Sequence, residues 1–204
     1  MLRLITAPAA RPVTLAEAKE WCRVDSDDTS QDTVLDILIR AATATAEHLT
    51  GRAFVERTYE LDLDGFEHTI ELPMAPLIGI DWVKYLASSD NTLTTFDSAS
   101  YEVDTASLPG RVRPVTTSAW PSIGTGFNPV RIQYRAGVAY PGSPTDLTDN
   151  SYLPAELRQW LAARIATAFE NREALAVDRG NLLALPRDYC DALLDPLVIG
   201  TRMF

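Results

Sequence analysis

The sequence predicts an α+β protein in which a layer of about four helices carries an inserted small antiparallel β-sandwich or barrel. Two segments, residues 31–50 and 154–172, place apolar residues at three- and four-residue steps, and a long stretch with strand-like alternation separates them. Neither helical segment could bury its apolar stripe alone, so pairing them in one layer is the economical arrangement. The composition, 46% hydrophobic and 23% charged, is that of a globular chain.

Two helices are expected before the β region. Thr14 is a good N-cap residue, and Glu17, three positions later, completes a capping-box pattern for the first helix. The second helix is expected from Gln31 to Thr50, and Gly51 follows where a left-handed C-terminal cap belongs. Its predicted apolar face consists of Val34, Leu38, Ala41, Ala42, Thr45 and Leu49.

About six short strands are expected in the middle of the chain. In the stretch TYELDLD, residues 58–64, apolar and acidic side chains alternate, which predicts one buried face and one face in water. Turn residues separate the strands, as is typical of a small sandwich or barrel. The other expected strands lie in residues 68–72, 77–86, 101–104 and 130–135, and one more begins at Val112 after a turn at residues 109–111.

Two further helices are expected after the β region. Pro154 stands at an allowed first-turn position of the third helix, and Pro186 opens a last short one. We therefore expect a discontinuous helical domain interrupted by an inserted β domain. The predicted boundaries are 1–52 and 150–204 for the helical domain, 53–137 for the β domain and 138–149 for a Pro/Gly/Asp-rich linker.

Few residues in the chain suggest catalysis. His48 follows Glu47 near the end of a helix, and His68 lies in a loop; a structural role is the simpler interpretation of both. The stretch DSDDTSQDTVLD, residues 25–36, resembles a calcium loop only in part. Ser30 stands where that loop needs glycine, and the final bidentate glutamate is missing. We expect no catalytic residue, no cofactor and no metal ligand.

Two other patterns have a functional and a structural interpretation. Glu60, Asp62 and Asp64 could serve as glycosidase carboxylates, but simple alternation of acids is typical of a solvated strand face. Trp82 and Trp120 could line a sugar-binding groove, or they could belong to the core or to an interface.

The net charge of −10 argues against binding to nucleic acid or anionic membranes. Only Arg131 and Arg135 approach a basic cluster. Cys22 and Cys190 are interpreted as buried thiols in a reducing compartment. No apolar run is long enough for a signal peptide or a membrane helix, so a cytosolic protein without a membrane partner is expected.

A set of short segments follows a characteristic order and spacing along nearly the whole chain. These segments are PVTLAEAKEWCRVD (12–25), LIRAATATAEHLTGRAF (38–54), ELPMAPL (71–77), YEVDT (101–105), GRV (110–112), AWP (119–121), NPVRIQYRAG (128–137) and ENREA (170–174). In their order and spacing, the chain resembles the head–tail connector, or adaptor, proteins of tailed phages and phage-derived gene transfer agents.

The resemblance implies a structural protein without catalytic residues. It implies a homo-oligomeric ring, dodecameric in the particle, that docks under the portal protein and extends the channel through which DNA passes without specific binding. It also implies a platform for a tail-side connector or stopper protein. The protein would be made in the host cytoplasm and end in the virion or phage-like particle. The alternative is a carbohydrate-binding or hydrolytic module encoded in a prophage cluster.

The C-terminal stretch DPLVIGTRMF, residues 195–204, has little polar cover. Such residues at a free terminus favour burial against a partner, although the tail could also fold back on its own helices. We expect Pro196 to end the last helix and the tail to dock into the portal or a neighbouring subunit. The predicted partner-binding residues are Leu197, Val198, Ile199, Arg202, Met203 and Phe204.

Overall fold

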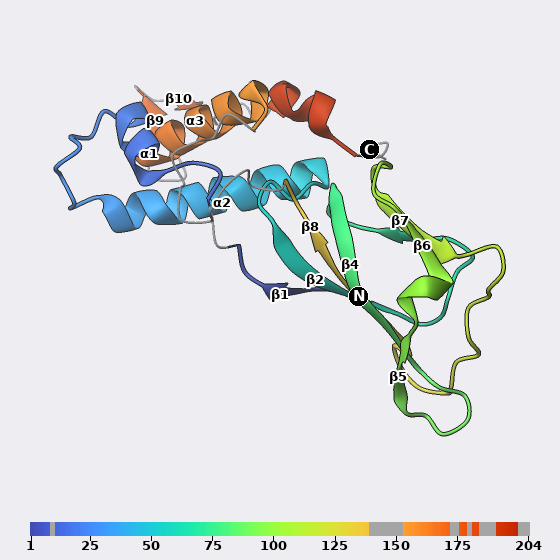
Figure 1. Ribbon diagram of the computed structural model, residues 1–204. Coiled ribbons are helices and arrows are strands. Elements are labelled where there is room, and N and C mark those ends of the chain that lie inside the picture. Colours follow the sequence, from blue (N-terminus) through green and yellow to red (C-terminus); the bar gives the residue numbers. More distant parts are fainter. Residues whose placement is uncertain (9–10, 139–152, 172–175, 179–180, 184–190, 200–204) are drawn as a thin grey trace. The chain divides into compact units, whose positions relative to one another are not determined.

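A computed structural model confirms the α+β class (Figure 1). The residues it describes are 1–8, 11–138, 153–171, 176–178, 181–183 and 191–199. The chain divides into two compact units. The β unit comprises Met1–Ala9 and Gly51–Tyr140, and the helical unit comprises Ala10–Thr50 and Pro141–Phe204.

The β unit contains two antiparallel sheets. The five-stranded sheet has the order β1 (Leu2–Thr6), β2 (Arg57–Leu63), β8 (Val130–Ala136), β4 (Leu77–Leu86) and β5 (Leu93–Phe96). The three-stranded sheet has the order β3 (Ile70–Leu72), β7 (Gly110–Pro114) and β6 (Tyr101–Asp104), and a short 3-10 helix, η1 (Ser98–Ser100), precedes β6. Among the described residues neither sheet closes on itself, because each ends in edge strands.

One core serves both sheets. Alternate residues of β2 and β8, such as Leu61 and Ile132, pack with Leu72 of β3 and Val112 of β7. Aromatic side chains extend this core, and Phe66 stacks on Trp120 with ring centroids 4.5 Å apart. Burial of apolar surface from strands far apart in the sequence therefore holds the two sheets together.

The N-terminus differs from the expectation. Residues 1–9, assigned from the sequence to the helical domain, belong to the β unit, because β1 pairs with β2 in antiparallel register. The stretch is short and lies far from its partner strand in the chain, so no local hairpin pattern predicted it. Strand β5 was also not predicted, because its four residues, LTTF, are too few for a clear alternation.

The acidic face of β2 is not in water as predicted. Glu60 and Asp62 are both buried. Arg3 on the neighbouring strand forms ion pairs with Glu60 and with Asp62, the latter at 3.1 Å between Nε and Oδ2. Strand β1 covers one edge of β2. Its Arg3 side chain compensates the negative charges of Glu60 and Asp62, which β1 helps to bury.

The helical unit begins as the sequence predicts. Thr14 caps α1 (Leu15–Trp21) in a capping box: the Glu17 amide donates to Thr14 Oγ1 at 3.2 Å, and the Thr14 amide donates to Glu17 Oε2 at 2.9 Å. Helix α2 (Asp32–Thr50) ends at Gly51, whose φ of 69° is the left-handed cap conformation. These local signals were sufficient to place both helices.

The buried face of α2 is rotated relative to the predicted one. Leu35 and Ile39 are fully buried, whereas Ala41 and Thr45 of the predicted stripe are exposed. Alanine and threonine line both candidate stripes, so neighbouring stripes of this helix have similar hydrophobicity and the pattern alone does not separate them. Contacts with α1 and α3 (Ala155–Glu170) select the face.

Helix α3 runs within the predicted range and buries Leu157, Trp160, Leu161 and Ile165. Two short strands, β9 (Ala176–Asp178) and β10 (Asn181–Leu183), then pair antiparallel. The last described element is a 3-10 helix, η2 (Ala192–Leu197). The predicted opening of the last helix at Pro186 and the linker at 138–149 fall largely outside the described residues.

Candidate partner-binding site

The first half of the predicted docking tail is held by the helical unit. Pro196 does not end the last helix as expected, because it lies inside η2, which continues to Leu197. The Ile199 amide donates to the carbonyl oxygen of Thr50 at 2.8 Å, and Leu197, Val198 and Ile199 are half-buried. This hydrogen bond fastens the chain to the C-terminal end of α2.

Side-chain contacts also hold the chain around η2 to the helical unit. Leu194 of η2 is fully buried, and the Trp160 indole on α3 donates to Asp191 Oδ1 at 3.0 Å. The segment up to Ile199 is therefore part of the helical unit. The remaining predicted partner-binding residues, Arg202, Met203 and Phe204, lie outside the described residues.

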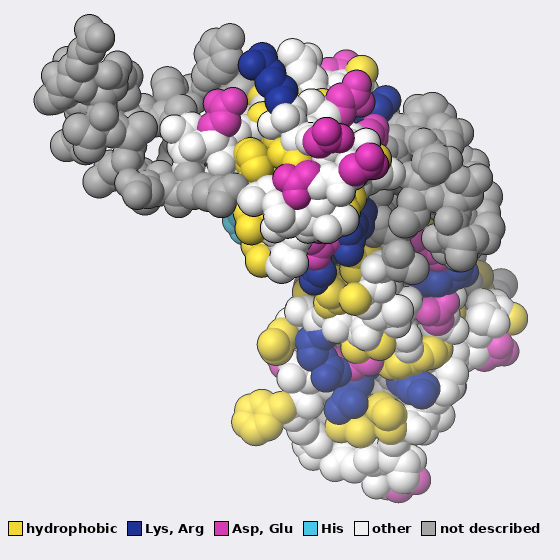
Figure 2. All heavy atoms as spheres, turned by 90° about the vertical axis from the view of Figure 1, so that its left-hand side faces the viewer, with side chains coloured by type: hydrophobic (Ala, Val, Ile, Leu, Met, Phe, Trp, Pro, Cys, Tyr) yellow, Lys and Arg dark blue, Asp and Glu magenta, His cyan; other side chains and the backbone are white. Residues whose placement is uncertain are grey.

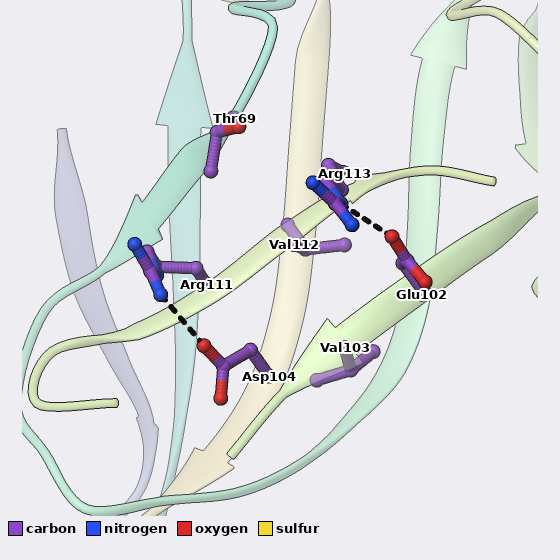
Figure 3. A pocket seen from close by; sticks show the side chains of 7 residues that line it. All are labelled: Thr69, Glu102, Val103, Asp104, Arg111, Val112 and Arg113. Atoms are coloured by element: carbon purple, nitrogen blue, oxygen red, sulfur yellow. Dashed lines mark hydrogen bonds and ion pairs between the residues drawn. The ribbon is translucent and has the colours of Figure 1, made fainter. Parts of the chain in front are cut away.

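A second surface, on the three-stranded sheet, was not predicted. A pocket of about 350 Å³ lies over β6 and β7 (Figure 3). Two cross-strand ion pairs span it: Arg111 Nη2 lies 2.8 Å from Asp104 Oδ2, and Arg113 pairs with Glu102. The charges in the pocket balance, so it presents neither a net anionic nor a net cationic site.

Asp104 is the most strongly hydrogen-bonded carboxylate of this pocket. The Ser107 hydroxyl donates to Oδ2 at 2.6 Å, and the Ala106 and Ser107 amides donate to Oδ1. Together with Arg111, these donors hold the pKa of Asp104 well below its usual range, with the Ser107 hydroxyl the largest cause. The carboxylate thus stays ionised and fixes the turn between β6 and β7.

Basic residues gather on one face of the five-stranded sheet, and the sequence had indicated only two of them. The strand registers place Arg3, Lys84, Arg131 and Arg135 on this face. In the view of Figure 2, Lys and Arg side chains gather over the strands and Asp and Glu side chains over the helices.

Two of these four basic residues form ion pairs with acids. Arg135 pairs with Asp81 at 3.1 Å and with Glu56 at 3.3 Å, and Arg3 pairs with two acids as described above. Lys84 lies 4.4 Å from the centre of the Trp82 ring. Arg131 forms no ion pair within the described part of the chain. Such a face lacks the run of free cations that phosphate backbones need.

The other residues considered from the sequence have local roles. Asp28 in the polar loop accepts the Ser30 amide at 2.8 Å, and Asp32 pairs with Lys19 at 2.7 Å. His48 lies exposed on α2. In the described ranges, no group of three or more His, Cys, Asp or Glu residues could hold a metal ion. No described helix has the length and apolar character needed to span a membrane.

The two tryptophans considered for a sugar groove have different surroundings. Trp82 lies under the Lys84 ammonium group. Trp120 stacks on Phe66, and its indole nitrogen donates to the Glu67 carbonyl oxygen at 2.7 Å. Each ring therefore has its own packing partner, and these contacts do not indicate a groove shared by the two tryptophans.

Comparison with known protein families provides the evidence for the class of protein. Residues 12–91 match the phage gp6-like head-tail connector protein family. The matched stretch covers α1, α2 and β2 to β4, and so reaches from the helical unit into the β unit. It confirms over this range the resemblance to head–tail connectors. No curated protein sequence matches the chain.

Solved structures with a similar fold extend the likeness to the whole chain. A chain from the neck of an empty gene transfer agent (GTA) particle, computed with C6 symmetry, matches with a TM-score of 0.75 and 22% identity. A chain from the virion of a native GTA particle gives 0.76 and 22%, and one from the native neck, computed with C12 symmetry, gives 0.68 and 24%. Each alignment covers 98% of this chain and 96% of the other.

Proposed function

We propose that this protein is a structural head–tail connector of a tailed phage or phage-like particle. The match of residues 12–91 to the connector family carries the proposal. The fold likeness to neck components over 98% of the chain supports it, because it includes the segments outside that match. In this role the protein performs no catalysis and needs no cofactor.

In the particle, the protein forms a homo-oligomeric ring of twelve copies under the portal protein. The ring extends the DNA channel and provides the platform for a tail-side connector or stopper protein. The net charge of −10 suits this task, since like charge keeps the DNA from adhering to the channel. The protein is made in the host cytoplasm and ends at the head–tail junction.

The β unit is, in this proposal, an antiparallel sandwich inserted into a helical connector domain. The shared core of its two sheets supports this description. The insertion leaves the helical layer at Gly51, directly after α2. Each unit offers a separate surface, which suits a subunit that must contact several neighbours.

The C-terminal tail docks into the portal or into the neighbouring subunit. Leu197, Val198 and Ile199 are half-buried, so part of each residue remains available to a partner. Arg202, Met203 and Phe204 follow as the outer contacts, and Ile199 and Phe204 are the anchors. The hydrogen bond from Ile199 to Thr50 places the departure point of this tail beside the end of α2.

Reconstitution with portal rings tests the proposed function. Purified protein is mixed with portal rings from the same particle and viewed by electron microscopy. We expect an added ring on the portal and, in a producing strain lacking the gene, DNA-filled heads without tails. Normal tailed particles from that strain would contradict the proposal. Binding to a glycan array without binding to the portal would favour the carbohydrate-binding alternative.

Deletion of residues 200–204 tests the docking tail. The truncated subunit keeps the hydrogen bond from Ile199 to Thr50 and the buried Leu194, so we expect it to keep its fold and its melting temperature. It should attach to portal rings at least about tenfold more weakly, as expected when apolar anchors are removed. Replacing Arg202 alone by alanine is the matched milder variant. Attachment at the wild-type level by the truncated subunit would reject the docking role.

A further inference from the structure

A groove lies along α1, at one end of the helical unit. It has a volume of about 520 Å³, and it is lined by residues of α1 and of the loop that follows: Leu15, Ala16, Lys19, Glu20, Val24 and Ser26. Leu15 and Val24 are half-buried and Ala16 is exposed, so part of the apolar lining is in contact with water. Such a surface favours burial against another apolar segment.

The surroundings of the α1 groove carry a net negative charge. The Lys19 ammonium group is neutralised, because it lies 2.7 Å from Asp32 Oδ1 and donates to the Ser26 carbonyl oxygen at 3.2 Å. Arg23 is the one other cation of residues 15–28, and it is exposed. Four acids in the lining or in the following loop are exposed: Glu20, Asp25, Asp27 and Asp28. Figure 2 looks onto this end of the helical unit and shows Asp and Glu side chains beside apolar ones.

Residues 200–204 are too short to reach the α1 groove of their own copy. The hydrogen bond from Ile199 to Thr50 holds the chain at the C-terminal end of α2, whereas the ion pair of Lys19 with Asp32 holds the groove at the N-terminal end of that helix. Figure 1 shows α1 beside the start of α2 and η2 beside its end. The 19 residues of α2 separate these two points by about 27 Å, but residues 200–204 extend over at most about 18 Å. They can therefore enter this groove only in another copy.

The composition of residues 200–204 is complementary to the α1 groove. This segment, GTRMF, lies outside the described residues. It contains one cation, Arg202, two large apolar side chains, Met203 and Phe204, and no acid. The cation suits the exposed acids, and the apolar side chains suit the apolar lining.

We propose that residues 200–204 of one copy of this chain bind in the α1 groove of the neighbouring copy in the ring. This inference rests on the proposed function, because it identifies the surface that receives the docking tail. A ring requires head-to-tail contacts in which each subunit uses two different complementary surfaces. The tail leaves the helical unit at one end of α2 and the groove lies at the other end, so the two surfaces suit such a contact.

Directed disulfide formation tests the contact. In a background carrying Cys22→Ser and Cys190→Ser, a single chain carries both Met203→Cys and Ala16→Cys. Mild oxidation of rings assembled on portals should link each chain to the next and give a ladder of multimers, since a disulfide needs the two Cα atoms within about 7 Å. Ala44→Cys, on the exposed side of α2, replaces Ala16→Cys as the control and should give no ladder. Absence of the ladder from the test chain, or a monomer with an internal disulfide, overturns the proposal.

Two defective variants test the direction of the contact. Deletion of residues 200–204 removes the tail but leaves the groove, and Ala16→Arg obstructs the groove but leaves the tail. Each should lower ring assembly by about tenfold or more, as expected when the centre of an interface is lost, whereas Ala44→Arg should not. Mixed in equal amounts, the two variants should form dimers of one copy of each, because one intact tail then meets one intact groove. Rings at the wild-type level from either variant overturn the proposal.

The outcomes separate this inference from the proposed function. Wild-type protein that attaches to no portal rejects the connector role. The ladder can then be sought at high protein concentration in solution, where its presence or absence decides the contact between copies. Truncated subunits that form normal rings but do not attach to the portal leave the connector role intact and overturn this inference, because the tail would then bind the portal.

Discussion

At the scale of single residues, the identity of the buried face of α2 has a direct energetic consequence. Ile39 is fully buried, whereas its neighbour Leu38 is only partly covered. Ile39→Ala should therefore lower the free energy of unfolding by about 2–5 kcal/mol. Leu38→Ala should cost clearly less, and urea unfolding of the two variants measures the difference. If the two variants lost equal stability, or if Leu38→Ala lost more, the face of α2 predicted from the sequence would be the buried one.

Gly51 should tolerate no side chain without a loss of stability. Its φ of 69° lies in the left-handed region, where a β-branched side chain is strained. Gly51→Val should reduce the free energy of unfolding by about 1 kcal/mol or more. Gly65→Ala is the control, since an added Cβ there meets its nearest atom at 3.8 Å and φ is not positive. Thermal denaturation that ranks Gly65→Ala as the more damaging change would refute the capping role.

These residue-scale features differ in how far the sequence predicts them. The capping box at Thr14 and the cap at Gly51 are local, because the interacting atoms lie within a few residues of one another. The burial of Glu60 depends on Arg3, which lies 57 positions earlier in the chain. No pattern within β2 could reveal that partner.

At the scale of elements, β1 protects the acidic side of β2. Arg3 contacts both buried acids, so Arg3→Met should leave two carboxylates without their arginine and cost about 1–3 kcal/mol. Adding Glu60→Gln and Asp62→Asn should recover much of this loss, and a chemical denaturation cycle measures the coupling. If the triple variant is no more stable than Arg3→Met, the ion pairs do not carry the contribution of β1.

The sequence predicted where most strands lie better than it predicted which strands pair with one another in a sheet. The alternating segments around Tyr59, Tyr101 and Ile132 form β2, β6 and β8 as expected. Strand β1 contributes an unpredicted edge, because pairing across more than fifty residues leaves no local trace. The pocket over β6 and β7 escaped prediction for the same reason, since it exists only when Arg111 and Asp104 face each other across two strands.

At the scale of the whole molecule, the acidic balance predicts behaviour toward DNA. On the basic face of the five-stranded sheet, Arg3 and Arg135 are paired with acids, and the net charge of the chain is −10. The free protein should therefore show no measurable binding to duplex DNA at physiological salt, as fluorescence anisotropy can test. Micromolar binding that weakens steeply with added salt would reveal a phosphate-binding surface and contradict a passive channel wall.

The sequence by itself determined the period of each long segment, the two helix caps and the acidic balance, and it indicated the connector family. These properties follow from neighbouring residues or from sums over the chain. Only the tertiary structure decided which face of α2 is buried, that residues 2–6 join the sheet, and that Ile199 is fastened to Thr50. The physical reason is that burial and pairing energies depend on which distant segments meet, and a linear pattern with several nearly equivalent apolar faces leaves that choice open.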